Sequence, residues 1–229
     1  MRLANGSVGH SRHRTSGGIA AFHPSMIITS NRQSQIQSAE IIRCGGVIAF
    51  RTDTFYGLGA DPFNKSAVRQ IRRLKGREDD KPILLLISDP SEVDRFIINQ
   101  SQLFKEVANR FWPGRLTIVG IASAAIPIES TAGTNTIGLR LPDDEDLRAL
   151  VRKCGGALTA TSANISGQPP AQTAKDVENY FPQGIHLIID GGEVTATQPS
   201  TVLDLSGAKP SLIREGAVTR GELEGFGVR

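Results

Sequence analysis

The sequence lacks the short motifs that mark several common classes of enzyme. It contains no GxxxxGK segment followed by Ser or Thr, which excludes a P-loop, and no GxSxG segment. No GxGxxG segment opens a helix after the first predicted strand, so a Rossmann dinucleotide site is not supported. Histidine is scarce as well, and of the four histidines only His186 lies beyond residue 23. Catalytic triads and zinc sites that depend on histidine are therefore poorly supported.

Cysteine and long apolar runs are also few. Cys44 and Cys154 are far apart in the sequence and form no CxxC motif, which predicts two free thiols in a reducing compartment. No apolar run approaches the ~18 residues that a membrane span needs, so no membrane partner is predicted. Hydrophobic residues still make up 39% of the 229 residues, enough for a sizeable core in one domain. The net charge of +3 favours an anionic partner such as a nucleotide or RNA.

Acidic residues are missing from the start of the chain, where the first one is Glu40. The 39 residues before it carry four arginines and seven serines, a composition similar to that of an organelle transit peptide, but they show no strong amphipathic helix. We predict that residues 1–30 form a disordered or targeting-like extension and that residues 31–229 form one folded domain. The predicted location is the cytoplasm, with the mitochondrion as the alternative if the leader is a transit peptide.

Helical and strand patterns alternate from residue 30 onward. Apolar stripes at helical spacing predict helices over 30–46, 64–76, 101–112, 143–156, 174–181 and 219–226, with Asn64 capping the second and Gly76 ending it. Short apolar runs predict strands over 46–51, 82–88, 116–122, 136–141, 157–164, 185–190, 200–205 and 211–215. This alternation predicts an α/β fold with a mixed sheet.

A dense block of charge precedes one of the buried strands. The segment LKGREDDKPILLL, residues 74–86, contains Lys75, Arg77 and Lys81 together with three acids. Cations are favoured at the C-terminal end of a helix, which accounts for Lys75. That preference accounts less well for Lys81 and for the acids that crowd beside it, so the block is a candidate for ligand binding.

Polar loops follow several other predicted strands. TSANISG, residues 161–167, offers hydroxyls, an amide and backbone N–H groups, which can hold a phosphate without a P-loop but are also common in plain turns. Thr52, Asp53 and Thr54 follow the strand over 46–51, while Ser200 and Arg214 lie at strand edges. Taken singly, each of these loops is explained by an ordinary turn, helix cap or strand edge. Their shared position at strand ends of an α/β sheet predicts one crevice.

Eight motifs occur together in a fixed order. The chain reads RTDTFYGLGAD at 51–61, LKGREDDKPILLL at 74–86, FWPGRLTIV at 111–119, TIGLRLPDD at 136–144, TSANISGQPP at 161–170, DGG at 190–192, PSTVLDL at 199–205 and IREG at 213–216. In this order they resemble the YrdC/Sua5 family of L-threonylcarbamoyladenylate synthases, from about residue 36 to residue 218. The chain departs from the family pattern at four positions: Arg51, Arg115 and Thr161 replace proline, and Pro199 replaces glutamate.

The resemblance implies a fold and a reaction. The fold is a twisted mixed β-sheet flanked by helices, with a basic concave groove, in the short form without an additional C-terminal domain. The reaction joins L-threonine, bicarbonate or CO₂, and ATP to give threonylcarbamoyl-AMP and pyrophosphate, with Mg²⁺ held by ATP and not by protein ligands. A downstream tRNA threonylcarbamoyltransferase complex would then modify adenosine 37 of tRNAs that read codons beginning with A.

The chemistry assigns roles to the polar residues. Transfer at phosphorus needs alignment and neutralisation of charge more than covalent help, which suits Arg77 and Lys81 for the phosphates and Lys75 for the carbamate. The forked guanidinium of Arg140 suits a carboxylate. We therefore assign catalysis to Lys75, Arg77, Ser162 and Asn164, ATP binding to Arg77, Lys81, Thr136, Ser162 and Arg214, and threonine binding to Thr54, Arg140 and Ser200.

Three alternatives remain open at this point. A basic concave face could bind double-stranded RNA or tRNA by phosphate contacts alone, without adenylate synthesis. The chain could also be a paralogue that uses another amino acid or acyl acceptor, or a subunit that regulates translation through RNA. The hydroxyl and amide loop at 161–167 and the carboxylate-sized arginine site favour the synthase, because RNA binding needs neither.

Overall fold

The computed structural model describes residues 26–76 and 82–228, which form one mixed sheet with helices on both faces. The strands are β1 (Met26–Thr29), β2 (Ile48–Phe50), β3 (Gly57–Gly59), β4 (Leu84–Ile87), β5 (Ile97–Ile98), β6 (Leu116–Ala122), β7 (Thr136–Arg140), β8 (Ala157–Ser162), β9 (Leu187–Asp190), β10 (Thr201–Asp204) and β11 (Ser211–Arg214). The helices are α1 (Arg32–Arg43), α2 (Lys65–Leu74), η1 (Pro90–Glu92), α3 (Val93–Phe96), α4 (Gln102–Phe111), α5 (Ile128–Thr131), α6 (Glu145–Lys153), α7 (Ala174–Tyr180), α8 (Arg220–Leu223) and η2 (Glu224–Phe226).

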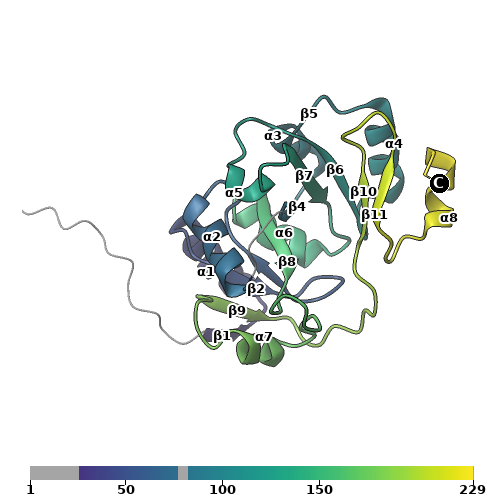
Figure 1. Cartoon of the computed structure of the whole chain (residues 1–229). Coiled ribbons are helices and arrows are strands. Elements are labelled where there is room, and N and C mark those ends of the chain that lie inside the picture. Colours follow the sequence, from purple (N-terminus) through teal and green to yellow (C-terminus); the bar gives the residue numbers. More distant parts are fainter. Residues whose placement is uncertain (1–25, 77–81, 229) are drawn as a thin grey trace, which may run out of the picture.

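The strand order is β1-β9-β2-β3-β8-β4-β7-β6-β10-β11, and β5 pairs with β6. Parallel pairs such as β4 with β7 alternate with antiparallel pairs such as β4 with β8. Figure 1 shows β1 and β9 at one end of the sheet and β10 and β11 at the other. The predicted α/β class with a mixed sheet is confirmed.

Helices cover the two faces of the sheet unequally. Side chains of α2 and α7 pack with Ala49 and Leu58, and side chains of α3 and α4 pack with Leu85. On the opposite face, side chains of α1 and α6 pack with Phe50 and Leu86. Because successive side chains of a strand point to opposite faces, these contacts fix which residues share the face of α1 and α6.

The ends of α2 follow directly from its sequence. The Asn64 side chain accepts a hydrogen bond from the Ala67 N–H, which caps the first turn as predicted. At the other end Gly76 has φ +62, a left-handed conformation that costs glycine little. Lys75, the last residue before this turn, is only 5% exposed, so the end of the helix carries a cation into the protein interior.

Some parts of the fold differ from the sequence-based expectation. The domain boundary predicted at residue 30 is wrong by several residues, because β1 pairs in parallel with β9 and so belongs to the sheet. Gly57–Gly59, where the sequence predicts no strand, form β3 between β2 and β8. Within the described residues no helix is long and apolar enough to cross a membrane. Cys44 and Cys154 are free thiols, and burial raises the pKa of Cys154 to about 12.

Candidate active site

The register of the strands brings several predicted site residues onto one face. Arg140 pairs with Leu86, and Leu86 pairs with Leu158, so Arg140 and Ser162 share the face of α1 and α6. Thr136 lies on the same face because it is four residues from Arg140 on β7. Further along the sheet, β6, β10 and β11 continue this face through Thr117, Val202 and Arg214. Several predicted site residues thus share one face of the sheet, while the crevice between them stays a prediction.

Lys75 is tied to the loop that follows β8. Its Nζ donates to the Ser162 backbone oxygen at 2.6 Å, to the Asn164 backbone oxygen at 3.0 Å and to Asn164 Oδ1 at 3.2 Å. Its distance to Ser162 Oγ is 3.5 Å. The Asn164 side chain in turn donates to the backbone oxygens of Ile165 and Gln168. Three of the predicted catalytic residues therefore form one hydrogen-bonded group.

A second group of charges centres on Asp53. Arg140 Nη2 lies 3.1 Å from Asp53 Oδ1, and Arg115 Nε lies 3.8 Å from Asp53 Oδ2. Burial lowers the pKa of the Arg140 guanidinium, Asp53 opposes that effect, and the cations Arg115 and Arg214 add to it. Arg115 and Arg140 thus share one carboxylate, and Arg214 adds a third positive charge that acts on Arg140, which makes this part of the face attractive to an anion.

Ser200 lies between two polar neighbours at the β10 end of the same face. Its Oγ is 3.1 Å from Thr117 Oγ1, and Arg214 Nη2 donates to its backbone oxygen at 2.7 Å. Burial lowers the pKa of Arg214. A Cβ on Gly216 would lie 2.3 Å from the Pro199 oxygen, so the glycine of the IREG motif allows the chain after β11 to approach Ser200 closely.

The loop between β2 and β3 links the two groups. Thr52 Oγ1 and Thr54 Oγ1 are 3.0 Å apart, and Thr52 Oγ1 also donates to the Phe55 oxygen. Asp53 of this loop contacts Arg140, while the Tyr56 oxygen accepts from the Ala163 N–H at 2.8 Å, next to Ser162. One short loop therefore reaches both the Lys75 group and the Arg140 group.

Tyr56 anchors this loop to the end of β9. Its hydroxyl donates to the Gly192 oxygen at 2.9 Å and to Asp190 Oδ1 at 3.2 Å, and it accepts from the Gly191 N–H at 3.1 Å. Burial raises the pKa of Tyr56 to about 12. The DGG motif at 190–192 thus holds the loop in place through a fully buried tyrosine.

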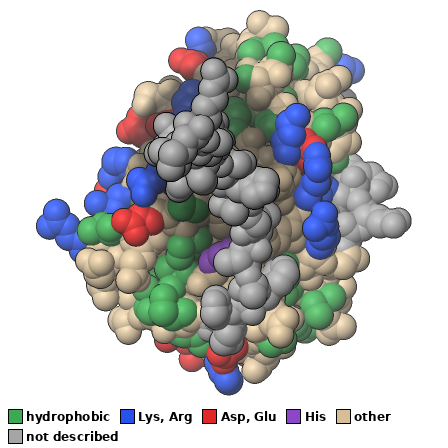
Figure 2. Space-filling model, turned by 90° about the vertical axis from the view of Figure 1, so that its left-hand side faces the viewer, with side chains coloured by type: hydrophobic (Ala, Val, Ile, Leu, Met, Phe, Trp, Pro, Cys, Tyr) green, Lys and Arg blue, Asp and Glu red, His purple; other side chains and the backbone are tan. Residues whose placement is uncertain are grey.

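The remaining predicted residues are placed as follows. Thr54 is buried, and Thr136 is half-buried with its hydroxyl 2.9 Å from that of Thr134. Arg77 and Lys81 lie outside the described residues. His186 lies away from these groups and accepts a hydrogen bond from the Val47 N–H, a structural role. The basic concave groove stays a prediction. Figure 2 shows one side of the molecule, with Lys and Arg side chains in several separate groups, some at its margin and some within the face.

Sequence reasoning assigned no role to three residues of this site: Asp53, Arg115 and Thr117. Asp53 was noted only as part of a polar loop, and Thr117 looks like an ordinary strand residue of LTIVGIA. Arg115 was noted only as a departure from the family pattern. A signal did exist for all three, since Asp53 lies within the RTDTFYGLGAD motif and Arg115 and Thr117 lie within the FWPGRLTIV motif.

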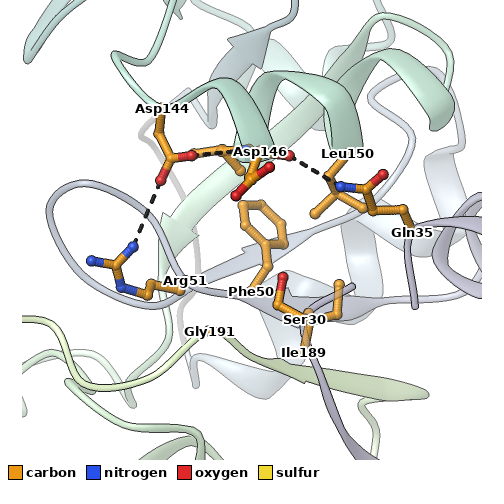
Figure 3. A pocket seen from close by; sticks show the side chains of 10 residues that line it. Ser30, Gln35, Phe50, Arg51, Asp144, Asp146, Leu150, Ile189 and Gly191 are labelled. Atoms are coloured by element: carbon orange, nitrogen blue, oxygen red, sulfur yellow. Dashed lines mark hydrogen bonds and ion pairs between the residues drawn. The ribbon is translucent and has the colours of Figure 1, made fainter. Parts of the chain in front are cut away.

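A cavity of about 180 Å³ lies next to this site, between α1, α6, β2 and β9 (Figure 3). The Arg51 guanidinium points toward Asp144 there, at 3.7 Å, and Phe50 and Leu150 supply apolar walls. Among the described residues, none of those predicted to bind ATP or threonine lines this cavity. The candidate site is therefore the polar sheet face, and the cavity is a separate feature beside it.

Comparison with known proteins gives a consistent result. The Sua5/YciO/YrdC family model, described as "Telomere recombination", matches residues 40–216. A threonylcarbamoyl-AMP synthase of Bacillus subtilis (strain 168) is 35% identical over 198 residues, which cover 86% of this chain and 57% of that protein. A second one, from Thiobacillus denitrificans, is 39% identical over 168 residues, covering 73% of this chain and 89% of that protein.

A solved structure is similar over most of the chain. The crystal structure of P. abyssi Sua5 complexed with L-threonine has a TM-score of 0.84 at 34% identity, covering 88% of this chain and 61% of that one. The chain thus spans little more than half the length of the Bacillus relative, at 57%, and most of the Thiobacillus relative, at 89%.

Proposed function

Because the chain belongs to the Sua5/YciO/YrdC family, we propose that it condenses L-threonine, bicarbonate or CO₂, and ATP to threonylcarbamoyl-AMP and pyrophosphate. The names of its relatives support this activity, and so does the threonine complex of P. abyssi Sua5. In this chain the proposal rests mainly on the state of one atom of the Arg140 side chain. Its Nη1 is buried and has no hydrogen-bond partner among the described residues.

A buried guanidinium nitrogen without a partner is costly, and a ligand carboxylate would remove that cost. Asp53 holds Nη2 of the same guanidinium, which fixes the direction in which Nη1 points. We assign Nη1 to the threonine carboxylate. Ser200 and Thr54, both buried hydroxyl residues of this face, are assigned to the rest of the amino acid.

The phosphate side of the reaction belongs to the Lys75 group. Lys75 holds the loop after β8 through Ser162 and Asn164, whose hydroxyl and amide we assign to the phosphates or the carbamate. Arg77 follows directly on Gly76 and is assigned to the phosphates, together with Lys81. Thr136 and Arg214 are assigned to the nucleotide.

We propose that Mg²⁺ enters with ATP and is held mainly by phosphate oxygens and water. Asp53, the carboxylate of the Arg140 group, suits a metal ion poorly because two guanidiniums already lie beside it. Across the parts of the chain that the structure describes, no cluster of three acidic, histidine or cysteine side chains could supply a metal site.

The chemistry needs two reactants aligned end to end. The threonine ammonium group loses a proton, and the resulting amine attacks CO₂ and releases a second proton to give a carbamate. A carbamate oxygen then attacks the α-phosphorus and displaces pyrophosphate. The loop between β2 and β3 connects the threonine group with the phosphate group, so it can hold the two reactants in register. Such positioning accounts for much of the rate in reactions that need little covalent help.

Isotope exchange between ATP and pyrophosphate tests the proposal. We expect labelled pyrophosphate to enter ATP only when both threonine and bicarbonate are present, because the adenylate must form before it can reverse. Exchange that ignores threonine or bicarbonate would contradict the proposed reaction, and so would a complete lack of exchange by the folded protein.

Some finer expectations stay proposals. The RNA-binding module without adenylate synthesis gains no support from the relatives' names. Transfer of the product to tRNA by a downstream complex and contact of this chain with tRNA or double-stranded RNA are both untested. The cytoplasmic location, with its mitochondrial alternative, is a further prediction that cell fractionation can check.

A further inference from the structure

Asp53 is a buried carboxylate whose oxygens lack hydrogen bonds. Its side chain is 10% exposed, and neither Oδ1 nor Oδ2 has a hydrogen-bond partner among the described residues. Arg140 Nη2 lies 3.1 Å from Oδ1 and Arg115 Nε lies 3.8 Å from Oδ2, so both guanidiniums form ion pairs with this carboxylate. Asp53 and Arg140 together supply three of the five buried side-chain N and O atoms that have no hydrogen-bond partner among the described residues.

An ionised carboxylate can accept about four hydrogen bonds, so an ion pair alone leaves most of its capacity unused. Leaving such a group buried and unsatisfied is costly. A ligand that brings N–H donors to Asp53 would offset this cost, just as a carboxylate would do for Arg140 Nη1. The two unsatisfied groups are neighbours, which points to one ligand that carries both an anion and a donor.

An α-amino acid has this combination, because its carboxylate and its ammonium group are attached to the same carbon. With the carboxylate on Arg140 Nη1, the ammonium group lies on the side of Asp53, which already contacts Nη2 of the same guanidinium. A metal cation is a poorer fit at Asp53, since Arg140 and Arg115 would repel it. Charge-assisted hydrogen bonds are also stronger than those of a neutral hydroxyl, which favours the ammonium over the threonine side chain.

We infer that Asp53 binds the α-ammonium group of the incoming amino acid, so that the site distinguishes an α-amino acid from a plain carboxylic acid. This inference rests on the proposed function and deepens it, because it gives the threonine site a second charged contact. Arg115, half-exposed beside Oδ2, places a further cation at the same carboxylate.

The test compares two ligands on the full chain by calorimetry, without ATP. One is L-threonine, and the other is 3-hydroxybutyrate of matching configuration, which lacks only the amino group. We expect the wild-type protein to bind threonine at least about tenfold more tightly, as the loss of a charged hydrogen bond implies. Equal affinity for both ligands would overturn the inference, and this result does not depend on any variant.

Two variants locate the effect. Asp53→Asn should remove most of the preference for threonine, whereas Asp94→Asn should keep it. Asp94 is an exposed aspartate on α3, a helix that packs on the opposite face. A full preference in Asp53→Asn would overturn the inference. If Asp53→Asn fails to fold, as circular dichroism would show, equal binding of the two ligands by the wild-type protein can still overturn the inference.

The failure of the inference can be told apart from the failure of the function. If the wild-type protein binds threonine no more tightly than 3-hydroxybutyrate, only the role of Asp53 is overturned. Lack of threonine binding by the folded wild-type protein would overturn both.

Discussion

Replacement of Arg140 by alanine should raise the KM for threonine far more than the KM for ATP. The guanidinium is 5% exposed, and its Nη1 has no partner among the described residues, so a ligand carboxylate there would form a charge-assisted hydrogen bond in a water-poor site. Such bonds contribute about 1.5–3 kcal/mol. That range corresponds to a rise of roughly 10-fold to 150-fold in the KM for threonine.

The same change should lower the stability of the folded protein. Removal of one partner of a buried ion pair costs about 3–5 kcal/mol when the other charge is left alone. In this variant Asp53 would still have the half-exposed Arg115 at 3.8 Å as a partner. The loss of folding free energy should therefore fall below that range. Arg140→Lys is the matched variant, since it keeps the charge but loses the fork, and it should give a smaller rise in the KM for threonine.

The assay is pyrophosphate release at saturating ATP with varied threonine, and then at saturating threonine with varied ATP. Thermal melting of each variant separates a loss of binding from a loss of folded protein. Equal rises in the two KM values for a folded Arg140→Ala protein would remove Arg140 from the carboxylate role and refute the reasoning.

Further predictions concern the phosphate group and the anchoring tyrosine. Lys75→Met should leave a folded protein with adenylate formation lower by orders of magnitude, and unchanged pyrophosphate release would contradict the role of Lys75. Arg77→Ala should have the same effect, and wild-type turnover would end its assignment to the phosphates. Tyr56→Phe should lower stability by about 1–2 kcal/mol in a urea melt, because three hydrogen bonds to the DGG motif are lost. The wild-type protein should also lose stability as the pH rises from 10 to about 12, since the folded-state pKa of Tyr56 is raised to about 12 and only the unfolded chain ionises in that window. Tyr56→Phe should lack this part of the loss, and equal losses in both proteins would contradict the role of burial.

The elements with strong local signals could be predicted from the sequence. Asn64 and Gly76 bound α2 because a cap and a left-handed glycine act within a few residues. The approach of Lys75 to Ser162 and Asn164 was predicted only as a shared crevice, because it depends on how β8 and the end of α2 meet in space.

Other features depend on long-range contacts and could not be predicted in this way. β1 has few residues and mostly exposed side chains, and it is a strand only because β9 lies beside it. β3 is rich in glycine, which disfavours strands, and its place between β2 and β8 overrides that preference. The two ion pairs of Asp53 arise only when Arg140 and Arg115 converge on it from separate parts of the chain.

We propose that this chain makes a mixed anhydride of threonine carbamate and AMP. Mass spectrometry of a reaction with ATP, threonine and isotopically labelled bicarbonate tests it most directly. We predict a product with the mass of threonylcarbamoyl-AMP that carries the bicarbonate label and forms only when all three substrates are present. A folded, pure protein that yields no such product, or one without the label, would contradict the account.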